Sequence, residues 1–127
     1  MDRLRTSSPY LLAALLAAAG TSHLLRPAWY DGLVPPVLPG PARAWTLLSG
    51  VVELAVAAAV TAPRTRRAGG LAAAALFVAV FPGNVWMALE PGGVPRWAAI
   101  ARLPLQVPLV LWGLQVAEKL SSTGRRA

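Results

Sequence analysis

The sequence of 127 residues contains no cysteine, which excludes disulfide bonds, thiol-redox motifs and thiolate metal sites. Charged residues are also scarce, at 13% of the chain, whereas 56% of the residues are hydrophobic. This composition lies far from that of a soluble globular domain. It therefore predicts a membrane protein, in which any redox role would depend on a cofactor or a partner.

Long apolar runs are abundant instead. A membrane-spanning helix needs about 20 mostly apolar residues, and the candidate runs lie at residues 9–25, 44–62, 69–89 and 98–118. Little sequence remains between them, so we expect one domain over residues 1–127. The predicted fold class is all-α, a membrane-embedded antiparallel four-helix bundle. The first run also resembles a signal-peptide core, which leaves its cleavage open.

Basic residues outnumber acidic ones, and the formal net charge is +7. They lie at the ends of the apolar runs, not in a stripe with interleaved aromatic residues, so we expect no nucleic-acid partner. If both termini are cytoplasmic, that side carries Arg3, Arg5, Arg64, Arg66, Arg67, Lys119, Arg125 and Arg126. The larger basic share on one side predicts a multi-pass protein of the cell (inner) membrane, with both termini cytoplasmic.

Glu53 lies inside the second apolar run, where a carboxylate is costly unless it is neutralised, paired or hydrated. The other runs also carry polar residues. At 1.5 Å per residue, His23, Asn84 and Arg102 lie about 5–8 Å from the outer ends of their runs, and Glu53 and Gln106 about 12–13 Å. We therefore predict one buried polar cluster in the outer half of the bundle, with Glu53 and Arg102 as an ion pair.

This cluster also has a structural interpretation, in which it only fixes helix packing and register. On that interpretation His23 lies at the bilayer surface, and Arg102 extends to the headgroups. Asn84 would then form hydrogen bonds with backbone groups that a kink at Pro82 leaves unpaired in the third run. Residues 26–43 are too rich in proline for a helix or a sheet, and we expect them to lie on the membrane or to cover a cavity.

Several short motifs resemble, in their order, those of the DoxX-like family of small four-helix membrane proteins. They are Gly20-x-x-His23-x-x-x-Pro27, Val34-Pro35-Pro36-x-x-Pro39, Ser49-Gly50-x-x-Glu53, Phe81-Pro82-Gly83-Asn84 and Arg102-x-Pro104-x-Gln106. The family is named for a membrane subunit associated with a terminal quinol oxidase or a thiosulfate:quinone oxidoreductase. The resemblance implies that His23, Glu53, Asn84, Arg102 and Gln106 occupy the recurring polar positions of the family.

We therefore expect an accessory or non-catalytic membrane subunit of a redox system, without catalytic or metal-binding residues of its own. A quinone or similar lipophile would bind in the polar pocket, and the partner would be a redox-enzyme subunit or a second copy of the chain. One alternative is a small proton-coupled transporter that uses Glu53. A permanent Arg102 charge beside Glu53 argues against it, because a transporter carboxylate must change its protonation. The other alternative is a purely structural assembly protein.

Overall fold

The computed structural model describes residues 2–89 and 95–124; Arg125 and Arg126 of the topology prediction lie outside them. In the described residues the protein is all-α. Its helices are α1 (Asp2–Leu25), α2 (Pro27–Asp31), α3 (Ala42–Thr61), α4 (Arg66–Ala79), α5 (Phe81–Leu89) and α6 (Arg96–Gly124). The segments long and apolar enough to cross a membrane are Ser7–Leu25, Ala42–Thr61, Arg66–Leu89 and Arg96–Glu118. These confirm the predicted fold class, a four-helix antiparallel membrane protein.

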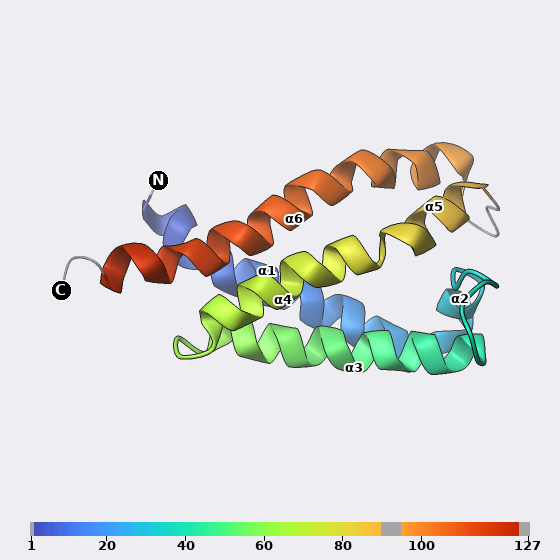
Figure 1. Cartoon of the computed structure of the whole chain (residues 1–127), viewed down its shortest axis with the longest axis horizontal. Helices are drawn as coiled ribbons and strands as arrows, with labels where there is room; N and C mark the ends of the chain where they lie inside the picture. The colour runs from blue at the N-terminus through green and yellow to red at the C-terminus, as the bar shows by residue number, and fades with distance from the viewer. Residues whose placement is uncertain (1, 90–94, 125–127) are drawn as a thin grey trace.

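The long helices are arranged as two pairs. α1 packs along α3, α4 packs along α6, and contacts between α3 and α4 join the two pairs. Figure 1 shows that the pairs lie close together at the end holding the turn between α3 and α4, and diverge towards the end holding α2. We call these the turn end and the α2 end.

Glycines set the closest approach within each pair. A Cβ atom at Gly20 in α1 would lie 2.8 Å from the carbonyl oxygen of Gly50 in α3, and one at Gly50 would lie 3.0 Å from that of Gly20. In the other pair, a Cβ at Gly70 would lie 2.7 Å from the oxygen of Gly113, and one at Gly113 would lie 2.9 Å from that of Gly70. Small residues at helix crossings permit such backbone contact, which provides dispersion energy that lipid cannot replace.

The apolar core lies towards the turn end. Its buried residues come from α1, α3, α4 and α6 and include Leu12, Leu16, Val56, Val60, Ala73, Phe77 and Val116. The indole of Trp112 on α6 donates a 2.8 Å hydrogen bond to the hydroxyl of the buried Ser8 on α1, which joins the N-terminal part of α1 to α6. Many large apolar side chains elsewhere are exposed, as expected for helix faces that contact lipid.

The basic turn between α3 and α4 also stabilises the end of α3. The guanidinium of Arg66 donates hydrogen bonds to the carbonyl oxygens of Val60 and Thr61, both at 2.9 Å. The last carbonyls of a helix lack donors within the helix, so this cation satisfies two of them. The same guanidinium lies 5.4 Å from the centre of the Tyr10 ring on α1.

Proline determines where the third apolar run breaks. α4 ends at Ala79 and α5 begins at Phe81, so the expected kink near Pro82 is present. Pro82 has no N–H to donate to the carbonyl four residues earlier, on Val78. α6 contains Pro104 and Pro108, yet it continues from Arg96 to Gly124.

The segment between α1 and α3 differs from its prediction. Residues 26–43 were expected to contain no helix because of their prolines, but Pro27–Asp31 forms the short helix α2. Pro27 occupies the first turn of that helix, where a missing N–H costs nothing and the restricted φ is already helical. The end of α1 at Leu25, before Arg26 and Pro27, agrees with the expected effect of proline on the preceding residue.

Candidate functional site

His23 and Glu53 form a buried pair where α1 crosses α3. The Nδ1 atom of His23 lies 3.2 Å from Oε2 of Glu53, and only 14% and 10% of the two side chains are exposed. Each residue follows one of the crossing glycines by three positions, and so lies on the same face of its helix as Gly20 or Gly50. The glycine contact therefore positions an imidazole beside a carboxyl group in an otherwise apolar crossing.

This pairing corrects the predicted ion pair between Glu53 and Arg102. Arg102 is exposed on α6, and α6 packs against α4 and α5, whereas α3 packs against α1 and α4. The prediction assumed that the second and fourth spans face each other, but the division into two helix pairs separates them. An exposed arginine agrees with the alternative in which its long side chain extends towards the headgroups.

Tyr30 in α2 covers the histidine. The two rings meet edge to face, with their centres 3.9 Å apart, and the Tyr30 hydroxyl lies 2.7 Å from the hydroxyl of Ser22 on α1. Trp29 packs edge to face on Tyr30, with 4.8 Å between the ring centres. These contacts place an aromatic cover over His23 at the α2 end, within the proline-rich segment 26–43.

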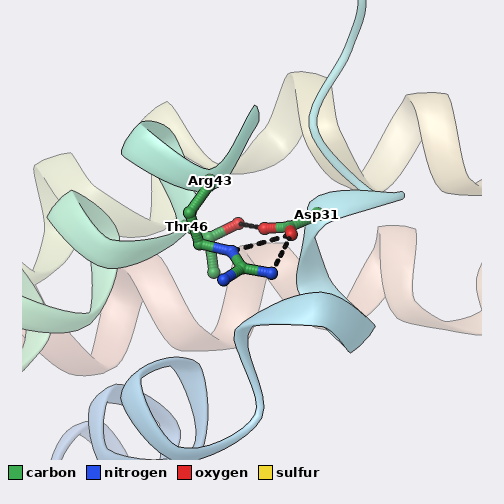
Figure 2. A network of polar contacts seen from close by, with 3 residues as sticks. All are labelled: Asp31, Arg43 and Thr46. Atoms are coloured by element: carbon green, nitrogen blue, oxygen red, sulfur yellow. Dashed lines mark hydrogen bonds and ion pairs between the residues drawn. The ribbon is translucent and has the colours of Figure 1, made fainter. Parts of the chain in front are cut away.

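Asp31 fastens α2 to the start of α3, as Figure 2 shows. Its Oδ1 accepts a 2.8 Å hydrogen bond from the hydroxyl of the buried Thr46, and its Oδ2 accepts one of 2.9 Å from Nε of Arg43. The hydrogen bond from the Thr46 hydroxyl is the largest cause that holds the pKa of Asp31 below its ordinary value. The hydrogen bond and the positive charge of Arg43 lower this pKa further. The cover over His23 is thus attached through a carboxylate.

Asn84 and Gln106 form a second polar pair, between α5 and α6. The Nδ2 atom of Asn84 donates a 2.7 Å hydrogen bond to Oε1 of Gln106. Gln106 is 7% exposed, and its Nε2 atom is buried without a hydrogen-bond partner in the described residues. The polar-cluster prediction placed Asn84 near Gln106, and the structural alternative assigned it to the helix kink; its side chain reaches across to Gln106 on the neighbouring helix.

The predicted polar residues are therefore divided. His23 and Glu53 lie together on α1 and α3, Asn84 and Gln106 lie together on α5 and α6, and Arg102 joins neither pair. Within the described ranges, no hydrogen bond or ion pair connects the two pairs. Their common role as a ligand site stays a prediction.

Sequence reasoning missed Tyr30, Ser22, Asp31 and Thr46. The sequence does contain one signal for Asp31. It is one of only five acidic residues, and a scarce carboxylate indicates a polar partner, as it does at Glu53. Tyr30 and Ser22 carried no comparable signal, since their contact depends on the turn that α2 makes back over α1.

Other features of the chain do not enlarge this site. A surface hollow of about 120 Å³ is lined by Arg67, Leu71, Leu114, Ala117 and Glu118, on α4 and α6 at the turn end. It is therefore separate from the polar pocket predicted in the outer half. In the residues that the structure describes, no group of three His, Asp or Glu side chains is placed to bind a metal ion.

Comparison with known proteins gives one match. Residues 12–117 match the family described as a domain of unknown function, DUF8561, and this range includes all five predicted polar residues. No curated protein and no solved structure matches the chain. This match does not assign the chain to the DoxX-like family, so that resemblance stays a prediction. In its described residues the chain has four helices long and apolar enough to span a membrane, and because the match covers most of the sequence, the chain belongs to the DUF8561 family.

Proposed function

We propose that this chain is a non-catalytic membrane protein that binds a lipophile with a polar head, such as a quinone, beside His23 and Glu53. The observation that carries the proposal is the buried contact of 3.2 Å between His23 Nδ1 and Glu53 Oε2. Neither atom makes a hydrogen bond of good geometry in the described residues. Buried polar atoms are normally satisfied, and the exceptions mark functional sites disproportionately.

The chemistry of the pair suits such a head group. An imidazole and a carboxyl group can each donate or accept a hydrogen bond according to their protonation. A quinone ring offers carbonyl oxygens in its oxidised form and hydroxyls in its reduced form, so the pair can bind either. The resemblance to DoxX-like proteins, which carries Gly20-x-x-His23 and Ser49-Gly50-x-x-Glu53, supports a quinone-linked accessory role with a redox enzyme or a second copy as partner.

The binding proposal is tested with the purified full chain in lipid nanodiscs, titrated with decylubiquinone while its tryptophan fluorescence is recorded. Glu53→Gln should weaken binding about tenfold or more, because it replaces an acceptor oxygen at a buried contact. Glu118→Gln, the same substitution at an exposed carboxyl group on α6, is the control and should leave binding unchanged. Equal binding by wild type and Glu53→Gln would refute the site, whereas loss of the folded protein would favour a structural role.

A small proton-coupled transporter is the second candidate, and one observation favours it. The partner of Glu53 is His23, which can gain or lose a proton, and not the permanent cation Arg102. The objection that a fixed positive charge would prevent Glu53 from changing its protonation is thereby removed. A buried His–Glu pair is able to hold a proton or release it, as a transport cycle requires.

Flux measurements separate the two candidates. Proteoliposomes with an imposed pH gradient should accumulate a lipophilic cation such as ethidium if the chain is a transporter, and Glu53→Gln should abolish the accumulation. Accumulation that does not exceed that of empty liposomes, together with quinone binding, supports the first candidate.

The orientation with both termini in the cytoplasm is a further part of the proposal. It is supported by the basic turn residues Arg64, Arg66 and Arg67, which would lie on the same side as the termini. Alkaline phosphatase fused after Ala127 should be inactive, and a fluorescent protein fused there should be bright. The reverse result would invert the proposed topology.

A further inference from the structure

The unpaired amide of Gln106 points to the chemical class of the ligand. Its Nε2 atom is buried, and no acceptor in the described chain pairs with it. Pro104 and Pro108 lack the N–H groups that would bond to carbonyls one turn earlier in α6, yet Gln106 does not donate to those carbonyls either. A buried N–H without a partner is costly in an apolar surrounding, so an acceptor from outside the chain is expected.

Asn84 determines what kind of acceptor fits. Its Nδ2 donates to Oε1 of Gln106 at 2.7 Å, which engages the Gln106 oxygen and leaves the nitrogen as the available end of the pair. An ammonium group has no lone pair with which to accept this hydrogen bond. A hydroxyl oxygen can accept it, but the hydroxyl hydrogen then needs an acceptor of its own, and the Gln106 oxygen already receives one hydrogen bond from Asn84. A carbonyl oxygen brings only lone pairs, which match an N–H donor.

The depth of Asn84 and Gln106 in the bundle limits which molecules can supply the carbonyl oxygen. Gln106 follows the start of its candidate span at Arg96 by ten residues, or about 15 Å along the helix, and Asn84 precedes the span end at Leu89 by about 8 Å. Both lie well inside the apolar region, where water is scarce. Two membrane components carry carbonyls with long apolar tails, namely quinones and ester-linked phospholipids.

We propose that the Asn84–Gln106 pair is a carbonyl-binding site for a lipophile, in which Gln106 Nε2 donates the hydrogen bond and Asn84 holds the amide in orientation. This site is separate from the His23–Glu53 pair, so the inference goes beyond the proposed function and shares with it, for the quinone source, only the class of ligand. A specific consequence is that the oxidised quinone, with its carbonyls, binds at this pair in preference to the reduced quinol, with its hydroxyls.

The first arm of the test uses the full chain in nanodiscs of ether-linked phosphatidylcholine, which contains no ester carbonyl. Decylubiquinone is titrated in its oxidised and reduced forms while tryptophan fluorescence is followed, with Trp86 on α5 as a nearby reporter. We expect the oxidised form to bind about tenfold more tightly than the reduced form. Gln106→Leu should remove that difference, and Gln115→Leu, an exposed glutamine on the same helix, should preserve it.

The second arm tests the lipid source. Native mass spectrometry counts the phospholipids retained by chains taken from ester-linked and ether-linked nanodiscs. If an ester carbonyl is the acceptor, wild type retains more ester-linked lipid, and Gln106→Leu loses the preference. Because Gln106→Leu leaves Asn84 without its acceptor, the double variant Asn84→Leu/Gln106→Leu is measured beside it, with thermal unfolding as the check on folding.

The outcomes separate this inference from the proposed function. Quinone binding that does not depend on Gln106, without an ester preference that does, overturns the inference and leaves the proposed function standing. No quinone binding, together with an ester preference that depends on Gln106, supports the carbonyl site and removes the quinone proposal. Absence of both the quinone effect and the ester preference overturns the carbonyl site.

Discussion

The two glycine crossings of this protein use the same packing and differ in what they position. Gly20 meets Gly50 between α1 and α3, and Gly70 meets Gly113 between α4 and α6. Three residues after the first two glycines come His23 and Glu53, whereas three residues after the others come Ala73 and Val116, both fully buried in the apolar core. One crossing therefore serves packing alone, and the other adds a titratable pair to the same geometry.

The largest expected effect comes from filling the crossings. Gly70→Ala and Gly50→Ala should each lower the free energy of unfolding by about 1–3 kcal/mol, because the new methyl group meets an atom of the opposing helix at under 3.0 Å. Thermal or denaturant unfolding in detergent measures this. Gly83→Ala is the control, since its nearest atom would lie 3.5 Å away, and it should not destabilise the protein. An equal loss of unfolding free energy in all three variants would contradict the close glycine contacts at the two crossings.

Two substitutions would give the α1–α3 crossing the apolar side chains of the α4–α6 crossing. The double variant His23→Ala/Glu53→Val places apolar side chains where α4 and α6 carry Ala73 and Val116. Replacement of a buried polar pair by apolar groups is often neutral or stabilising, so we expect the free energy of unfolding to stay the same or rise by about 1 kcal/mol. Lipophile binding should be lost. A large loss of stability would show that the pair holds the crossing together.

The cover over His23 should respond to pH through Asp31. The pKa of Asp31 is lowered in the folded protein, first by the Thr46 hydrogen bond, so ionised Asp31 stabilises α2 above its ordinary pKa of 3.8. This stabilisation is lost as the pH falls through the lowered value. The protection factors of the α2 amides, which correct for the slower intrinsic exchange in acid, should therefore fall only in acid. Asp31→Asn should lower these protection factors at neutral pH, and an α2 protected equally in both proteins would contradict the attachment.

The smallest effect is expected at Arg102, which sequence reasoning had made the partner of Glu53. Because its side chain is exposed on α6, Arg102→Ala should change the free energy of unfolding by no more than about 0.5 kcal/mol. Equilibrium unfolding beside Gly50→Ala measures the contrast. A loss comparable to that of Gly50→Ala would restore Arg102 to the polar site.

The sequence was sufficient to predict the spanning helices, because their length and apolarity follow from the thickness of the membrane. It also showed that Glu53 needs a partner, since a lone carboxylate is costly in an apolar run. The identity of that partner depended on which helices are neighbours, and helical spacing within one run carries no such information. The shared spacing of Gly20-x-x-His23 and Gly50-x-x-Glu53 was the available signal, since glycines that meet bring the residues three positions later together.

The contact between Ser8 and Trp112 has a consequence for the order in which the protein is made. The glycines that join α1 to α3 have both been synthesised by residue 50, whereas this hydrogen bond joins residues separated by 104 positions. Chains fold from the N-terminus as they emerge. The helix pair with His23 and Glu53 can therefore assemble while the ribosome is still at work, whereas the bond from Ser8 to α6 has to wait until Trp112 has been synthesised.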